Sequence, residues 1–141
     1  MNITPYLMLD GNAKEAAHFY ADVFDTPIES MELVKDWPQE FEGEIPQEIE
    51  DNVMHAHIKI GSTGLMLADA FPEDEYVPGT SITLMIDCKN TTEAKQLYDK
   101  LAEEGSVLFA FNETGFSPGY AQVKDKYGID WQIVTDSPEM D

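Results

Sequence analysis

The sequence predicts an α+β fold of two paired βαβββ modules that form an incomplete barrel with a concave cavity and helices on the convex side. Three observations favour it: two segments with helical spacing of apolar residues, short alternating segments around them, and an internal repeat. The repeat assigns residues 1–75 to the first module and residues 76–141 to the second. Because each half-buried sheet needs a partner for its apolar side chains, we expect the modules to pair.

The internal repeat is visible in two pairs of segments. Residues 83–87 (TLMID) follow the pattern of residues 6–10 (YLMLD), and residues 93–98 (EAKQLY) follow that of residues 15–20 (EAAHFY). The first half is longer, and the Glu-rich segment 36–51, interrupted by Pro and Gly, accounts for the difference. We expect this acidic segment to be a loop or flap between strands.

In the first module, an alternating segment ends at residues 10–12 (DGN), a turn that can also cap the following helix. Apolar residues at helical spacing then predict a helix over residues 13–24 that lies on a sheet. The acidic segment 36–51 is expected to be ordered only if side chains such as Trp37 and Phe41 dock on other parts of the chain. The expected strands are residues 4–9, 28–34, 53–60 and 64–70.

In the second module, a helix is predicted over residues 92–104, ending at Gly105 as a left-handed C-cap requires. In the last hairpin, Gly128 supplies the positive φ of the turn. The final strand then buries Trp131 on one face and presents Gln132 on the other. The expected strands are residues 83–87 and 107–111 and the two arms of segment 121–134.

Polar residues inside predicted strands point to a ligand cavity. A mid-strand amide such as Gln132 is favourable only where its face is wet or lines a cavity. His55 and His57 lie two apart on one strand, so both rings project from the same face. They fit hydrogen-bonded imidazoles, a metal-binding pair completed by Asp69 or another carboxylate, or a general base at His55. Asp69 and Asp125 also have the positions of turn carboxylates.

Charge and cysteine content limit the classes of partner. The net charge of -20, from 8 basic and 28 acidic residues, excludes nucleic acid and anionic membrane surfaces as partners. The single cysteine, Cys88, leaves no disulfide framework, and the first residues (MNITPYLML) lack the basic and long apolar regions of a signal peptide. No apolar run is long enough to span a bilayer, so a soluble cytoplasmic protein is expected.

The order of these motifs resembles the PhnB-like branch of the vicinal oxygen chelate superfamily, which includes glyoxalase I, extradiol dioxygenases and bleomycin-binding proteins. The resemblance covers nearly the whole chain. It implies paired βαβββ modules, a homodimer, and a metal or ligand site on the concave sheet. The motifs that carry it are residues 5–7, 10–13, 15–16, 19–20, 54–56, 65–69 and 125–128, and Trp131.

The same resemblance locates the metal site of the superfamily's enzymes, where His or Glu from the first, fourth, fifth and eighth strands binds a divalent ion. The corresponding positions fall at about Pro5, Met66, Ser81 and Gln132. Proline has no donor, methionine suits copper(I), and serine and glutamine are weak oxygen donors. We therefore expect no metal cofactor. The methyltransferase label often attached to PhnB-like sequences is not supported either, because no glycine-rich strand-to-helix turn for an adenosyl cofactor is present.

The sequence thus predicts a glyoxalase- or bleomycin-resistance-like homodimer that binds a small organic molecule in its cavity without a metal. The alternative is an enzyme of lyase, isomerase or dioxygenase type. It would use either a divalent metal at His55 and His57 or His55 alone as the catalytic residue. The predicted ligand-contacting residues are His55, His57, Met66, Asp69, Ser81, Thr83, Phe116 and Gln132.

Overall fold

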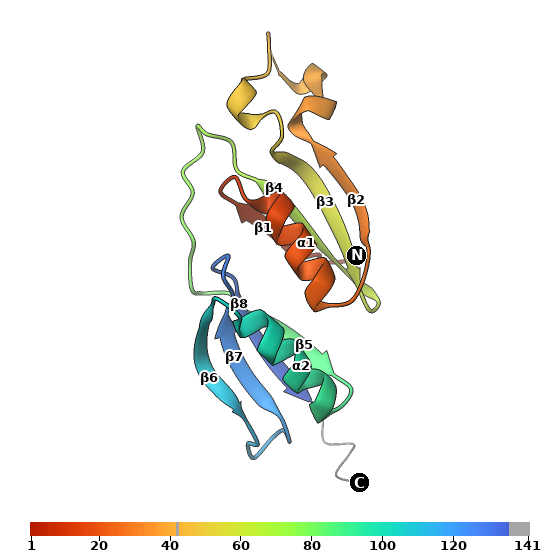
Figure 1. Cartoon of the computed structure of the whole chain (residues 1–141), viewed down its shortest axis with the longest axis vertical. Helices are drawn as coiled ribbons and strands as arrows, with labels where there is room; N and C mark the ends of the chain where they lie inside the picture. Colours follow the sequence, from red (N-terminus) through yellow and green to blue (C-terminus); the bar gives the residue numbers. More distant parts are fainter. Residues whose placement is uncertain (42, 136–141) are drawn as a thin grey trace. The chain divides into compact units, whose positions relative to one another are not determined.

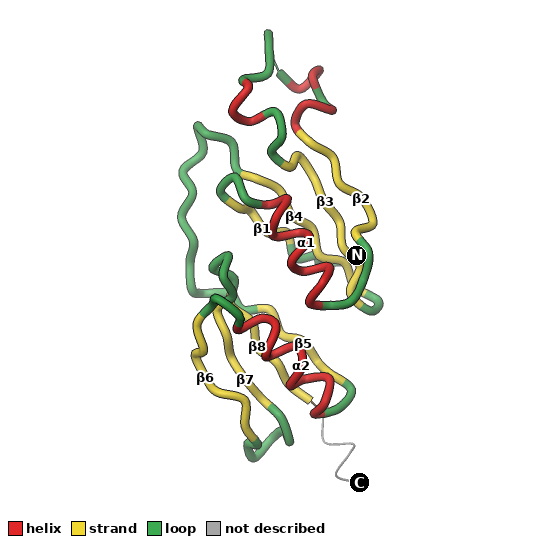
Figure 2. Tube along the Cα trace, viewed as in Figure 1, coloured by secondary structure: helices red, strands yellow, loops and turns green. Residues whose placement is uncertain are grey.

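The computed structural model describes residues 1–41 and 43–135, and the chain divides into two compact units, Met1–Val77 and Pro78–Asp141 (Figure 1). Each unit has the element order βαβββ and one four-stranded mixed sheet with a helix on one face (Figure 2). The predicted α+β fold of two βαβββ modules is therefore confirmed, with open rather than closed sheets. Among the described residues, no helix has the length and apolar content needed to cross a membrane.

The first unit has the strand order β1-β4-β3-β2, in which only β1 and β4 run parallel. Helix α1 packs on β3 and β4 through Ala16, Ala17 and Tyr20, which are fully buried. Of the apolar stripe expected from the sequence, Ala16, Tyr20 and Val23 are buried and Phe19 is half-buried. The bounds are β1 (Tyr6–Leu9), α1 (Ala13–Val23), β2 (Ile28–Leu33), β3 (Val53–Ile60) and β4 (Thr63–Asp69).

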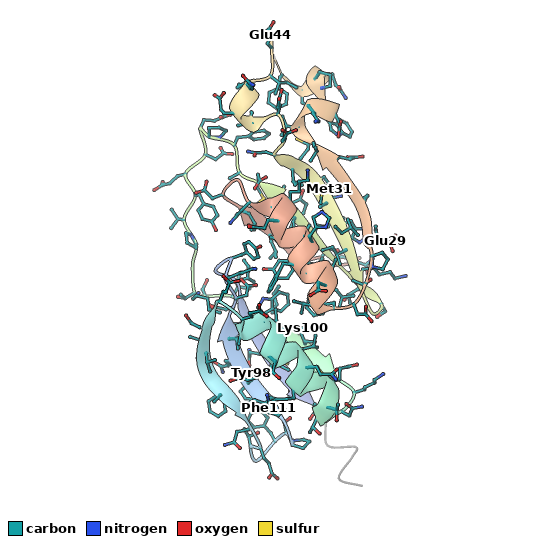
Figure 3. The ribbon with its side chains drawn as sticks, viewed as in Figure 1. Glu29, Met31, Glu44, Tyr98, Lys100 and Phe111 are labelled. Carbon is teal, nitrogen blue, oxygen red and sulfur yellow. The ribbon has the colours of Figure 1, made fainter. Side chains whose placement is uncertain are left out.

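The second unit repeats this topology with the order β5-β8-β7-β6. Helix α2 buries Ala94 and Leu101 over the sheet, and Tyr98 of α2 lies beside Phe111 of β6 with ring centroids 5.7 Å apart (Figure 3). Trp131 and Ile133 are buried on this helix-covered face, as predicted. The bounds are β5 (Leu84–Cys88), α2 (Thr91–Ala102), β6 (Ser106–Asn112), β7 (Tyr120–Lys124) and β8 (Asp130–Thr135).

Alternation along the strands gives each sheet a second face, which its own helix does not cover and which we call the helix-free face. In the first unit, Leu7 and Leu9 of β1 are buried towards α1, while Tyr6 and Met8 are exposed on the helix-free face. The paired registers place further residues on the helix-free faces: His55, His57 and Met66 in the first unit, and Met85, Tyr120, Gln122 and Gln132 in the second.

The helix ends differ from two sequence-based expectations. Asn12 makes no capping hydrogen bond at the start of α1. The Ala13 N–H donates instead to Asp69 Oδ1 at 2.9 Å, so the cap comes from a distant strand. At the end of α2, the left-handed residue is Glu104, with φ of 60°, and not Gly105. Gly105 is needed because a Cβ there would lie 2.3 Å from the Lys124 carbonyl oxygen. The predicted C-cap at Gly105 was therefore wrong.

The described residues of the acidic segment contact β2 and the residues that follow β4. It contains three short 3-10 helices, Val34–Asp36, Pro38–Glu40 and Gln47–Ile49, and Glu44 lies at its outer end (Figure 3). Trp37 Nε1 donates to Glu32 Oε2 at 3.2 Å, and the rings of Phe41 and Phe71 meet edge to face at 5.9 Å. These are the docking contacts on which the order of the segment was predicted to depend.

Candidate functional site

The helix-free face of the first sheet carries an imidazole paired with a phenol. Tyr6 Oη and His55 Nδ1 share a hydrogen bond of 3.2 Å, and their rings lie 5.9 Å apart. Tyr6 is only partly covered, but this partial desolvation raises the pKa of its hydroxyl above the usual 10.0, so the phenol is neutral at neutral pH. Glu32 pairs with His55 in the β2–β3 register. On this face, the Nδ1 atom of His55 is therefore already hydrogen-bonded to the Tyr6 hydroxyl.

His57 lies next to a shallow hollow at the β3–β4 hairpin. The hollow has a volume of about 360 Å³ and is bordered by both a carboxylate and an ammonium group. Gly64 lets the imidazole lie close to β4, because a Cβ at that position would be 2.7 Å from His57 Nε2. Met66 pairs with His57 in the register. The lining residues are Glu29, His57, Lys59, Ser62, Thr63 and Gly64.

Asp69 has a structural role at the end of β4. It is buried, its Oδ1 accepts from the Ala13 N–H, and its Oδ2 accepts from the Val53 N–H, both at 2.9 Å. One carboxylate therefore joins β4 to the starts of α1 and β3. Its predicted contact with a ligand stays a prediction.

The helix-free face of the second sheet carries a chain of four hydrogen-bonded polar side chains. Gln122 Nε2 donates to Tyr120 Oη at 2.7 Å, and the Tyr120 hydroxyl donates to Gln132 Oε1 at 2.5 Å. Gln132 Nε2 then donates to Thr83 Oγ1 at 2.7 Å. Gln132 thus lies at the centre of a polar network, which we call the Thr83–Gln122 chain.

Apolar side chains border the Thr83–Gln122 chain. Phe109 and Phe116 both meet the Tyr120 ring edge to face, with centroids 5.5 Å and 5.0 Å away. Met85 pairs with Gln132 in the β5–β8 register. Phe116 is 66% exposed and Met85 is 59% exposed, so large apolar surfaces lie beside the polar chain. An apolar border with a few placed polar groups is the usual composition of a small-molecule site.

The structure brings together some of the predicted site residues within each unit. His55, His57 and Met66 share the helix-free face of the first sheet, while Thr83, Phe116 and Gln132 lie around the polar chain of the second. Ser81 is exposed, ahead of β5.

Tyr120 and Gln122 were missed as site residues. The signal was available in the sequence, because Tyr120, Gln122 and Lys124 alternate along one strand and face the same side as Gln132. The Lys124 ammonium group already forms an ion pair, with its Nζ 2.7 Å from Asp130 Oδ1. No hydrogen bond of good geometry accompanies this ion pair.

The donor set does not fit the divalent metal of the superfamily's enzymes. Both polar atoms of the Gln132 amide are engaged, Oε1 by Tyr120 and Nε2 by Thr83. Within the described part of the chain, no group of three or more His, Cys, Asp or Glu side chains is arranged to bind a metal ion. These residues therefore do not supply the ligand set that a divalent metal requires.

Cys88 lies on the helix-covered face of β5 and is 3% exposed. Burial, and secondarily the charges of Glu93 and Asp87, raise the pKa of its thiol from 9.0 to about 12. Because the thiolate is the reactive form, its fraction at pH 8 falls by roughly 1000-fold. We expect Ellman's reagent to label the native protein at least that much more slowly than the urea-unfolded protein. Equal rates would show that the thiol is accessible and ionised.

The two βαβββ units with open mixed sheets have the fold of the vicinal oxygen chelate superfamily. The family model described as 3-demethylubiquinone-9 3-methyltransferase matches residues 1–134, and the chain belongs to that family, the PhnB-like branch of the superfamily. The chain is 28% identical over 147 residues to Protein YjdN of Escherichia coli (strain K12), covering 94% of each chain.

Two solved structures illustrate the range of similar proteins. A putative 3-demethylubiquinone-9 3-methyltransferase, PhnB protein, from Bacillus cereus is 28% identical, with a TM-score of 0.74 over 96% of this chain and 99% of that one. The fosfomycin resistance protein FosX of Listeria monocytogenes is 8% identical, with a TM-score of 0.63 over 99% of this chain and 94% of that one. At that identity, the second similarity shows the fold alone.

Proposed function

We propose that the protein binds a small organic molecule on the helix-free faces of its sheets, without a resident divalent metal. The observation that carries this proposal is the Thr83–Gln122 chain, a set of hydrogen-bonded polar groups bordered by exposed Met and Phe side chains. Polar groups fix the orientation of a ligand while apolar surface supplies most of the affinity. His55, His57 and Met66 are proposed as ligand contacts on the first sheet.

Binding can be tested with uncharged aromatic fragments, using acetophenone as the first probe. In ¹H–¹⁵N spectra of labelled protein, we expect the side-chain amides of Gln122 and Gln132 to shift on titration, together with backbone amides of β7 and β8. Amides on the helix-covered side, such as those of α2, serve as the internal control. Shifts confined to the control amides, or none at millimolar probe, would refute binding at this face.

The absence of a resident metal is a separate prediction. Protein purified without a histidine tag is expected to contain far less than one equivalent of zinc, nickel, manganese or iron. Neutral amide and hydroxyl ligands do not offset the dehydration of a divalent ion. Elemental analysis by mass spectrometry measures the content. One equivalent of metal that is lost in His55→Ala or His57→Ala protein would contradict the prediction.

That contrary result would make the alternative function the leading one. The hydrogen bond between Tyr6 and His55 is the observation that favours it, because a phenol can orient an imidazole that acts as a general base. An enzyme of this kind would use His55 with or without a metal. A substrate conversion abolished by His55→Gln in the metal-free protein would identify the version without one.

We also propose that the protein is a cytoplasmic homodimer that binds neither nucleic acid nor membrane. Strand β6 lies at the edge of its sheet and exposes Val107, Leu108 and Phe109, an apolar edge that needs cover to avoid aggregation. The net charge of -20 disfavours polyanionic partners. Light scattering at micromolar concentration is expected to give twice the chain mass of 15.9 kDa, and a monomer would refute the dimer.

A further inference from the structure

We infer that the Thr83 hydroxyl donates a hydrogen bond to the ligand, so that the site selects uncharged molecules with a hydrogen-bond acceptor beside an aromatic or aliphatic group. This inference rests on the proposed function and specifies its ligand class. It comes from the direction of the Thr83–Gln122 chain, in which each group donates to the next. This series of hydrogen bonds begins at the Gln122 amide and ends at the Thr83 oxygen.

The direction follows from the orientation of the two glutamine amides in the structure together with the inventory of protons. A tyrosine hydroxyl has one proton, and the Tyr120 oxygen already accepts from Gln122 Nε2, so its proton goes to Gln132 Oε1. The other end of the Gln132 side chain is then an NH₂ group, and this group faces Thr83 Oγ1. Since Thr83 accepts this bond, its own proton points to a different partner.

The Thr83 proton has no acceptor in the described residues of the unit. Thr83 precedes β5 and is exposed, and its one hydrogen bond is the one it accepts from Gln132. Aligned hydrogen bonds polarise one another, so donation into Thr83 makes its hydroxyl a better donor. The site therefore presents one free O–H beside the exposed side chains of Met85 and Phe116.

Charge on this face favours an uncharged ligand. The Lys124 ammonium group lies 2.7 Å from the Asp130 carboxylate, so an anion would have to compete with that carboxylate for the cation. An ammonium ligand has no lone pair with which to accept from Thr83. Aryl ketones, esters and amides have both the acceptor and the apolar group that the site requires.

A matched pair of probes separates the hydrogen bond from apolar contact. Acetophenone and ethylbenzene are similar in size, but only the ketone accepts a hydrogen bond. By NMR titration, we expect wild-type protein to bind acetophenone about fivefold more tightly than ethylbenzene, the gain expected of one neutral hydrogen bond. In Thr83→Val protein this preference is expected to disappear, while Thr83→Ser protein keeps it. Thr80→Val, an exposed neighbour, is the control and should keep it as well.

Three other outcomes have distinct meanings. Equal binding of both probes to the wild-type face would overturn the inference and leave the proposed function standing. Tighter binding of aniline than of acetophenone, dependent on Thr83, would show that the chain runs in the opposite direction and would also overturn it. If neither probe shifts the amides of β7 and β8, the proposed function fails and the inference fails with it.

Discussion

Asp125→Ala is expected to lower the free energy of unfolding by about 4 kcal/mol, because three donors lose a buried, charged acceptor. Asp125 is 3% exposed. Its Oδ1 accepts from the Tyr127 and Ile129 N–H groups at 2.8 and 3.1 Å, and its Oδ2 accepts from Trp131 Nε1 at 2.7 Å. Urea denaturation followed by tryptophan fluorescence measures the change.

Two variants test the explanation for Asp125. Asp125→Asn keeps one oxygen for the two backbone donors but turns its NH₂ group, which cannot accept, towards Trp131 Nε1, so about half of the loss is expected. Asp99→Ala removes an exposed carboxylate paired with Lys95 on α2 and is expected to cost less than about 0.5 kcal/mol. Equal costs for Asp125→Ala and Asp99→Ala would show that the buried bonds contribute little.

The role of Asp125 shows how far the sequence could predict the fold. The hairpin, its Gly128 turn and the two faces of β8 could be predicted, because Ile129, Trp131 and Ile133 alternate with polar residues and Gly128 has φ of 86°. The sequence also marked Asp125 as a turn carboxylate. It did not indicate the bond to Trp131, because a side-chain contact across a turn depends on the exact turn geometry.

The candidate site could also be predicted only in part, because contacts between side chains depend on details of the fold that the sequence pattern does not give. Gln132 could be identified from its position in the middle of a strand. The hydrogen-bond partners of Gln132 could not be identified in this way. They depend on the register that pairs Gln122 with Gln132 and on the segment that places Thr83 just before the start of β5. Asp69 illustrates a contact that the sequence could not indicate. Its position at the end of a strand was recognisable, but the two hydrogen bonds that its oxygens accept from the backbone of α1 and β3 depend on how these elements pack.

The connection after α2 is expected to be equally sensitive to substitution. In Gly105→Ala, the new Cβ would lie 2.3 Å from the Lys124 carbonyl oxygen and 3.1 Å from Asp125 Cα, both backbone atoms that cannot rotate away. The backbone must move, and overpacking of this kind costs about 3 kcal/mol. Thermal and urea unfolding measure the loss.

Gly79→Ala is the matched control for Gly105→Ala, because a Cβ at Gly79 meets no atom within 4 Å and its φ is not positive. Gly105 lies against the backbone of the turn that the Asp125 carboxylate stabilises. We therefore expect the double variant of Gly105→Ala and Asp125→Ala to lose less stability than the sum of the single losses. The first change already displaces the turn whose bonds the second removes. A loss equal to the sum would show that the two changes act independently and that Gly105 does not support the turn after β7.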